Sequence, residues 1–229
     1  MKPASTQFRH ERKFYLSPAD AAVLRQRAGM LLAPDRHSAR GAYKVSSLYF
    51  DDVHDTSLRE KLDGVAVRDK WRVRWYNDSL SPIHLERKHK ENDLGMKQHD
   101  AVTEAQFRRL EQGDMAVAAA QQGPVWQAFH TLHRLRCLRP VVVVSYRREA
   151  LACEAGNVRL TFDADLRAAR PGSPASIPVS TDGMTILEVK YDGFLPAVVA
   201  GLLSGVQYTQ LAISKYVMAR LTLMQAGYE

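Results

Sequence analysis

The sequence predicts a largely antiparallel α+β domain, and three observations support this fold class. About eight segments show the period-two alternation of β-strands, helical segments are short, and no regular strand–helix–strand order is present. The chain has 229 residues, 45% of them hydrophobic, which is enough for one packed core. We therefore expect a single domain over residues 1–229.

The first half of the chain begins with a strand over 7–15, where Arg9, Glu11 and Lys13 share one face. Capping residues, helical spacing and alternation predict the elements that follow it. They are a helix over 18–33 that Ser17 caps, a strand over 43–50, and a short helix over 56–62 that ends near Gly64.

An acidic loop precedes that short helix and contains Asp51, Asp52 and Asp55. Clustered carboxylates can hold a metal ion, but the same residues also cap turns and helix starts. We expect a capped turn here rather than a metal cluster.

Residues 70–90 predict two strands joined by a turn over 77–82. Alternation places Lys70, Arg72 and Arg74 on one face of the first strand, opposite two tryptophans and a valine. The second strand places His84, Glu86, Lys88 and Lys90 together. Two neighbouring strands therefore each carry a cationic stripe.

The second half continues with alternating strands and short amphipathic helices. The expected strands cover 96–102, 140–150, 157–166 and 185–191. The expected helices cover 103–111 and 124–135, then one follows the turn at 193–196 through Val198, Leu202 and Leu203, and a last one starts near Thr209. Residues 170–178, rich in Pro and Ser, are expected to form a loop. Tyr146 and Arg148 share one strand face, as do Arg159, Thr161 and Asp163, and also Glu188 and Lys190.

Composition narrows the class of partner. The net charge of +7 predicts an anionic partner without separating nucleic acid, nucleotide, polyphosphate or lipid.

Cys137 and Cys153 lack metal-ligand spacing, so we expect buried thiols in a reducing cytoplasm. No segment has the length of about 18 apolar residues that a membrane span requires, so we expect a cytoplasmic protein without its own transmembrane segment.

The stripes have an energetic consequence if helices cover the outer faces of the strands. Charged faces then point inward, and closing the sheet produces a charged interior. Moving cationic side chains from water into such an interior costs several kcal/mol for each one unless an anion compensates the charge. The cations are Lys13, Arg72, Arg74, Lys88, Arg148, Arg159 and Lys190, and only Glu11, Glu86 and Glu188 clearly share their stripes. A phosphate chain fits such an interior better than a duplex, because arginine binds phosphate oxygens bidentately.

The three glutamates each precede a lysine by two residues: Glu11 with Lys13, Glu86 with Lys88, and Glu188 with Lys190. A hard oxygen ligand beside a phosphate-binding ammonium suits Mg²⁺ or Mn²⁺ that bridges protein and phosphate. Ion pairing between strand neighbours is the alternative for any one pair.

Eight segments carry a resemblance to a known family. In chain order they are RHERKF, SLYFDD, EKLDG to KWRVRWY, HLERKHK, YRREA, VRLTFD, ILEVKY and SKY. In this order they resemble the triphosphate tunnel metalloenzyme (CYTH-like) superfamily, specifically its polyphosphate polymerase branch, the VTC (vacuolar transporter chaperone) domain. The resemblance implies a closed eight-stranded antiparallel β tunnel with helices packed outside.

The resemblance also implies site residues. Phosphate-binding and catalytic cations would be Arg72, Arg74, Lys88, Arg148, Arg159 and Lys190, with Lys13, Lys97 and Tyr146 also on the substrate phosphates and Ser214 and Lys215 at the tunnel mouth. Glu188 would be the leading metal ligand, supported by Glu86 and Glu11. The expected cofactor is Mn²⁺ or Mg²⁺.

One position departs from the pattern. Hydrolase and cyclase relatives carry ExExK on the first strand, whereas Arg9 stands at the first glutamate position here. This favours the polymerase branch. The sensing domain and membrane helices of the eukaryotic polymerase are not found in this sequence, so a separate membrane protein is the partner we expect for product export.

The predicted activity is transfer of the γ-phosphoryl group of ATP to pyrophosphate or inorganic polyphosphate. The phosphate acceptor is already ionised, which explains why no general base stands out. The alternatives are a metal-dependent triphosphatase and a non-catalytic polyphosphate-binding module. Nucleic-acid binding is disfavoured because Trp71 and Trp75 lie opposite the cations. The histidines His10, His54, His84, His89 and His99 show no ligand spacing.

Overall fold

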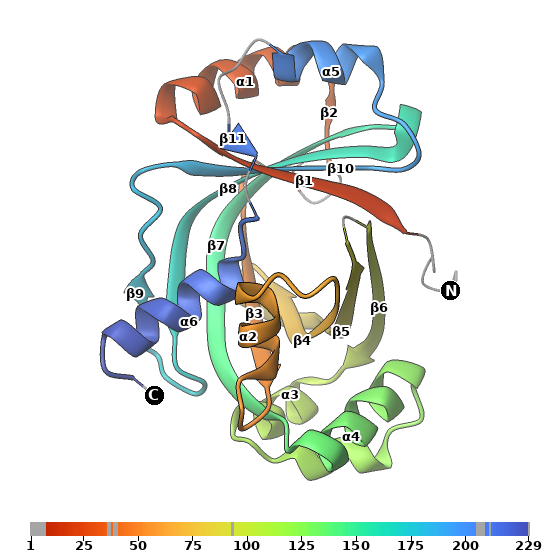
Figure 1. The fold of residues 1–229 in the computed structure, drawn as a ribbon, viewed down its shortest axis with the longest axis vertical. Coiled ribbons are helices and arrows are strands. Elements are labelled where there is room, and N and C mark those ends of the chain that lie inside the picture. The colour runs from red at the N-terminus through yellow and green to blue at the C-terminus, as the bar shows by residue number, and fades with distance from the viewer. Residues whose placement is uncertain are drawn as a thin grey trace.

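Eight strands form a closed antiparallel ring in this computed structural model, which describes residues 8–35, 38, 41–92, 94–204, 209–210 and 212–228. The order around the ring is β7-β3-β4-β5-β6-β1-β10-β8, and β8 pairs with β7 to close it. The predicted tunnel is therefore confirmed (Figure 1). The strands are β1 (Arg9–Leu16), β3 (Tyr43–Asp51), β4 (Val67–Tyr76), β5 (Ser79–Glu91), β6 (Leu94–Val102), β7 (Arg139–Cys153), β8 (Val158–Ala169) and β10 (Thr185–Tyr191).

Three two-residue strands extend this ring at its borders. They are β2 (Ala33–Pro34) on β7, β9 (Ile177–Pro178) on β8, and β11 (Thr209–Gln210) on β1. The segment expected as a loop over 170–178 thus ends in a short strand.

The hairpin of β4 and β5 forms one wall of the tunnel. Its turn is shorter than expected, because Asn77 and Asp78 both take positive φ and β5 begins at Ser79. Arg72 pairs with Glu86 across the two strands, so both charged stripes lie on the same side of the sheet. Alternation therefore predicted the orientation of both strands correctly.

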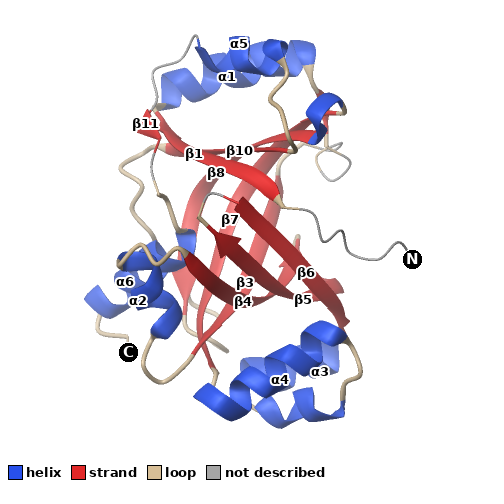
Figure 2. Cartoon of the chain, turned by 45° about the vertical axis from the view of Figure 1, so that its right-hand side comes forward, coloured by secondary structure: helices blue, strands red, loops and turns tan. Residues whose placement is uncertain are grey.

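Helices cover two outer faces of the ring (Figure 2). The helices α3 (Glu104–Glu111) and α4 (Pro124–Arg136), with the 3₁₀ turn Met115–Ala120, pack on the apolar faces of β4 and β5. The helices α1 (Pro18–Leu31) and α5 (Ala197–Ser204) cover β1, β8 and β10. The predicted Ser17 cap is confirmed, since Ser17 accepts from the amide of Asp20, and Thr103 forms a capping box with Gln106 at the start of α3.

The last helix, α6 (Lys215–Gln225), differs from the expectation in start and in place. It begins six residues after Thr209, because Ser214 caps it by accepting from the amide of Val217 at 3.4 Å. Its apolar side chains cluster with Val142 and Val144, which lie on the face of β7 that also carries Arg148. This helix therefore fills one end of the ring with apolar side chains instead of covering the outside.

The acidic loop after β3 is a capped turn, as expected. Asp51 accepts hydrogen bonds from the amides of Ser57 and Leu58 at the start of α2 (Thr56–Leu62), and Asp52 accepts from the amide of Thr56. Within the described residues, no three His, Cys, Asp or Glu side chains are grouped to hold a metal ion.

Both cysteines are free thiols, and the expectation that both are buried is wrong for one of them. Cys137 takes a left-handed conformation at the end of α4 and is exposed, whereas Cys153 is half-buried. The described part of the chain contains no helix with the length and apolarity needed to span a bilayer.

Candidate phosphate-binding tunnel

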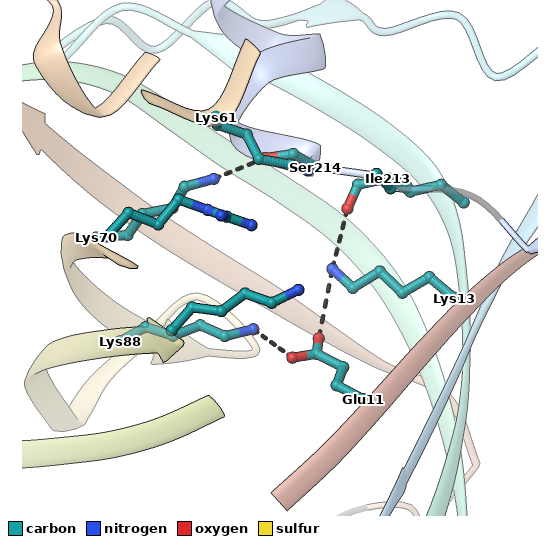
Figure 3. A pocket seen from close by; sticks show the side chains of 10 residues that line it. Glu11, Lys13, Lys61, Lys70, Lys88, Ile213 and Ser214 are labelled. Atoms are coloured by element: carbon teal, nitrogen blue, oxygen red, sulfur yellow. Dashed lines mark hydrogen bonds and ion pairs between the residues drawn. The ribbon is translucent and has the colours of Figure 1, made fainter. Parts of the chain in front are cut away.

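Two adjoining cavities lie inside the ring. The outer chamber has a volume of about 210 Å³ and is lined by Glu11, Lys13, Lys61, Arg68, Lys70, Lys88, Lys90, Ala212, Ile213 and Ser214. The inner chamber, of about 70 Å³, is lined by Glu11, Lys13, Tyr49, Lys70, Arg72, Arg74, Lys88, Tyr146, Arg148, Glu188, Lys190, Ser214, Lys215 and Tyr216. Five residues line both chambers, so the two adjoin. Figure 3 shows the side chains that line the outer chamber.

The arginines of the inner chamber are held by neutral hydroxyl acceptors as well as by carboxylates. Arg72 donates to the hydroxyl of Tyr49 at 3.0 Å, and Arg74 donates to Ser47 at 3.1 Å and to Tyr146 at 3.3 Å. Arg72 and Arg74 lower the pKa of the Tyr49 phenol against the opposing effect of burial. These guanidinium groups are thus preorganised and only partly neutralised.

Glu188 is the centre of the inner chamber. Its carboxylate lies 2.7 Å from the ammonium of Lys215, 3.1 Å from Lys190, 3.4 Å from Lys13 and 3.6 Å from Arg148. Burial raises its pKa, but the four cations outweigh burial and hold the pKa well below the ordinary value. Glu188 is therefore ionised and surrounded by exchangeable cationic partners.

Asp163 is a buried fourth carboxylate that the sequence analysis did not count among the counter-ions. It accepts two hydrogen bonds of 2.6 Å from Arg148, and its second oxygen lies 2.7 Å from Lys215. Its place in a polar stripe of β8 was visible in the sequence, but its direct pairing with Arg148 depends on the β7–β8 register. Asp163 anchors two cations behind the chamber wall.

Glu11 lies at the junction of the two chambers. One carboxylate oxygen accepts from Lys88 at 2.6 Å, while the other, Oε1, is buried with no hydrogen-bond partner and has Lys13 at 3.4 Å. Lys88 and Lys13 hold its pKa well below normal against the effect of burial. A buried oxygen of this kind is available to a cationic ligand.

These two glutamates fit a divalent metal better than Glu86 does. A Mg²⁺ or Mn²⁺ ion at a phosphate site takes one or two protein carboxylates and completes its shell with phosphate oxygens and water. Glu188 and the unpartnered oxygen of Glu11 face one cavity and supply those ligands.

Three predicted site residues do not line either chamber. Glu86 is 1% exposed, with one oxygen bonded to Arg72 at 2.8 Å and the other to Lys97 at 2.9 Å. Arg159 instead pairs with Asp35 at 2.9 Å and donates to Tyr43. Glu86 and Lys97 therefore hold Arg72 in place, and we do not retain Glu86 as a metal ligand or Arg159 as a catalytic residue.

The other eleven predicted residues are brought together in the inner chamber. They are Glu11, Lys13, Arg72, Arg74, Lys88, Tyr146, Arg148, Glu188, Lys190, Ser214 and Lys215. Lys215 lies deeper than the mouth position expected for it, because it is 7% exposed between Glu188 and Asp163. Ser214 does lie at the junction, where its hydroxyl accepts from Lys70.

Arg9, the residue that departs from the ExExK pattern, points away from both chambers. Its guanidinium lies 2.6 Å from Asp192 and also donates to the backbone carbonyl of Asn157. The first strand therefore contributes one carboxylate, Glu11, to the tunnel.

Lys70 lines both chambers and was missed as a site residue, although its stripe was recognised. Its ammonium donates to the hydroxyl of Ser214 at 2.9 Å and lies 5.2 Å from the ring centre of Tyr216. Among the described residues it has no carboxylate partner. Burial and the nearby Lys13 and Lys88 lower its pKa well below the ordinary value.

The comparisons with known proteins agree with this geometry. The VTC domain family model matches residues 8–224, which confirms the predicted resemblance. A Bacillus halodurans protein named as a candidate adenylate cyclase is similar in structure with a TM-score of 0.51 and 12% identity, covering 97% of this chain and 91% of that one. The PH1012 protein of Pyrococcus horikoshii OT3 gives a TM-score of 0.50 and 13% identity, with 92% and 98% coverage.

At these identities the two structural likenesses show the fold alone, and no curated protein matches the sequence. The family match extends over almost all of the chain, including every strand of the ring. The chain therefore belongs to the VTC domain family.

Proposed function

We propose that the protein is a metal-dependent polyphosphate polymerase, which transfers the γ-phosphoryl group of ATP to a growing inorganic polyphosphate chain. The observation that carries this proposal is the inner chamber, where eight Lys and Arg side chains and two glutamates line one narrow cavity. Such an excess of buried positive charge is compensated by a triphosphate. The acceptors would be pyrophosphate and polyphosphate.

Binding would exchange ion pairs within the chamber. In the structure, Lys13, Lys190 and Lys215 are paired with Glu188. When a triphosphate enters, these ammonium groups turn to its oxygens. Glu188 is then released to hold a divalent cation, together with Glu11.

The chemistry follows from charge rather than from a protein nucleophile. A bound Mg²⁺ or Mn²⁺ ion would neutralise charge on the phosphate oxygens. Arg72, Arg74 and Arg148 stabilise the charge that spreads over the transferring phosphoryl group, because their positions are set before the substrate arrives. A terminal phosphate oxygen of the acceptor attacks in line and displaces ADP.

The state of the carboxylates favours a phosphate acceptor over water. A hydrolase must activate a water molecule, and a good general base has a pKa near the working pH. Glu11 and Glu188 have pKa values well below normal because lysines surround them. Both are assigned to the metal ion in this proposal, so neither is left as a general base, and a phosphate acceptor needs none.

The test is incubation of purified protein with ATP, Mn²⁺ and pyrophosphate, followed by a polyphosphate gel and a free-phosphate assay. We expect chains that lengthen with time, and we expect Glu188→Ala to abolish them while the surface control Lys44→Gln does not. Free phosphate without chains would instead identify a triphosphatase. Binding without turnover would identify a non-catalytic polyphosphate-binding module.

A further inference from the structure

A third cavity lies apart from the two chambers, beside the end of α6. Its volume is about 580 Å³, and none of its lining residues lines either chamber. Three segments form it: the start of β7, the turn that follows β8, and the C-terminal half of α6 with the residues after it. The lining residues are Arg139, Pro140, Val141, Arg170, Pro171, Gly172, Ser173, Pro174, Arg220, Leu223 and Tyr228.

Positive charge dominates this third cavity, because three of its eleven lining residues are arginines and none is Asp or Glu. The exposed Arg139 and Arg170 have no carboxylate partner in the part of the chain that the structure describes. Arg220 is 7% exposed; its Nη2 lies 2.9 Å from Asp55, whereas its Nη1 is buried with no hydrogen-bond partner. A buried donor without an acceptor is unfavourable. Because Arg220 lines the cavity, a bound anion can supply the missing acceptor.

The remaining wall indicates that the anion carries an apolar ring. Five of the eleven lining residues are Pro, Val or Leu, and the guanidinium of Arg170 lies 5.0 Å from the ring centre of Tyr228. Nucleobases stack on aromatic side chains and on arginine. The volume also lies within the range of about 300–1,000 Å³ that is typical of sites for small organic molecules. An inorganic phosphate would use only the arginines, whereas a nucleotide would use both parts of the wall.

We propose that the third cavity binds a nucleoside monophosphate, with its phosphate on Arg139 and Arg220 and its base against Arg170 and Tyr228. No carboxylate lines the cavity, so this binding needs no divalent cation. The site shares no lining residue with the tunnel, and it stands or falls independently of polymerase activity.

The experiment compares adenosine 5′-monophosphate (AMP), adenosine and ribose 5-phosphate by calorimetry in the presence of a chelator. Arg139→Met removes a phosphate contact and keeps the apolar stem, and Tyr228→Ala removes the stacking ring. Their matched controls are Arg108→Met, a surface arginine on α3, and Phe194→Ala, an aromatic residue that is 61% exposed elsewhere. Lys88→Met changes the tunnel alone, because Lys88 lines both chambers and not the third cavity.

The wild type is expected to bind AMP more tightly than either adenosine or ribose 5-phosphate. Arg139→Met should weaken AMP by about tenfold and leave adenosine unchanged, because adenosine carries no phosphate. Tyr228→Ala should weaken AMP and adenosine by about tenfold each and leave ribose 5-phosphate unchanged. Both controls and Lys88→Met should retain the AMP affinity. Arg139 and Tyr228 are exposed, so the melting temperatures of their variants should equal that of the wild type.

Three results would overturn this site. The first is no AMP binding at millimolar concentration in the wild type. The second is a loss of AMP affinity in Lys88→Met with none in Arg139→Met, which would place the nucleotide in the tunnel. The third is equal affinity for AMP and ribose 5-phosphate, which would mean that the ring of the ligand contributes nothing and that the cavity takes a phosphate group alone.

Discussion

The ammonium of Lys215 lies 2.7 Å from a carboxylate oxygen of Glu188, which joins the first residue of α6 to the middle of β10. Asp163 lies at the same distance on another side of this ammonium. Both carboxylates raise the pKa of Lys215 against the effect of burial. The pair thus connects the last helix to the wall that would hold the metal.

Replacing Lys215 by methionine is expected to weaken both folding and binding. Removing one partner from a buried ion pair costs about 3–5 kcal/mol, because the other charge stays buried. We expect the low end of this range, since Glu188 retains Lys13 and Lys190, and Asp163 retains Arg148. Urea denaturation measures the loss. Lys215→Arg should recover part of the stability, and a stability equal to wild type in Lys215→Met would contradict the pairing.

Glu188 and Glu86 are expected to differ in their effect on metal dependence, although each belongs to a Glu-x-Lys segment. Glu188→Gln should raise the Mn²⁺ concentration needed for half-maximal turnover by about tenfold or more. Glu86→Gln should instead raise KM for ATP, because it weakens the contacts that hold Arg72, and should leave the Mn²⁺ requirement unchanged. An equal shift in the Mn²⁺ requirement of both variants would show that Glu86 is a metal ligand after all.

Lys70→Met is expected to stabilise the fold and weaken triphosphate binding. The folded-state pKa of Lys70 is lowered, so its charge costs folding energy at every pH below that pKa. The cost shrinks as pH rises from the folded pKa toward the unfolded value of 10.5, because the folded protein then releases this proton first. The variant should gain about 1 kcal/mol at neutral pH, and its advantage in melting temperature should decline at alkaline pH.

The same lysine predicts proton uptake on binding. A phosphate chain beside Lys70 favours the charged ammonium, so binding above neutral pH should draw protons from the buffer. Calorimetry in two buffers of different ionisation enthalpy measures this uptake. Lys70→Met should reduce it, and identical uptake in variant and wild type would exclude Lys70 as the group that titrates.

Tyr216→Phe tests whether the hydrogen bond between Tyr216 and Asp51 positions α6. The hydroxyl of Tyr216 donates to Asp51 at 2.5 Å, and both residues are buried. Losing this bond to a charged acceptor should cost about 1.5–3 kcal/mol and lower triphosphate affinity through the displaced start of α6. Tyr15→Phe is the matched control, because the Tyr15 hydroxyl donates to a weak acceptor, the sulfur of Met218, at 3.5 Å. Equal losses in the two variants would mean that the Asp51 contact has no special role.

The closed ring was expected from the family resemblance, whereas strand alternation, a local property, predicted which residues share the charged faces. Arg72 and Arg74 line the inner chamber while Trp71 and Trp75 pack beneath the outer helices, as their parity requires. The start of α6 was misplaced for a local reason as well. Apolar spacing extends upstream of Ser214, and the cap is defined by the hydrogen bond that the Ser214 side chain accepts from the amide of Val217.

The roles of individual carboxylates could not be predicted, because they depend on which strands become neighbours. Glu86 faces Arg72 across β4 and β5, whereas Glu188 faces Lys13 across β10 and β1. Identical Glu-x-Lys segments thus acquire different surroundings. The outer chamber was missed for the same reason, since Lys61 reaches it from a helix and Lys90 from the end of a strand.

The position of α6 determines when the site can exist during synthesis on the ribosome. All eight ring strands are complete at Tyr191, but Ser214 and Lys215 emerge only afterwards. Until then, the inward faces of Val142 and Val144 lack the helix that buries them, and such exposed apolar surface favours aggregation. The helix that buries this apolar patch is therefore the same one that completes the chamber.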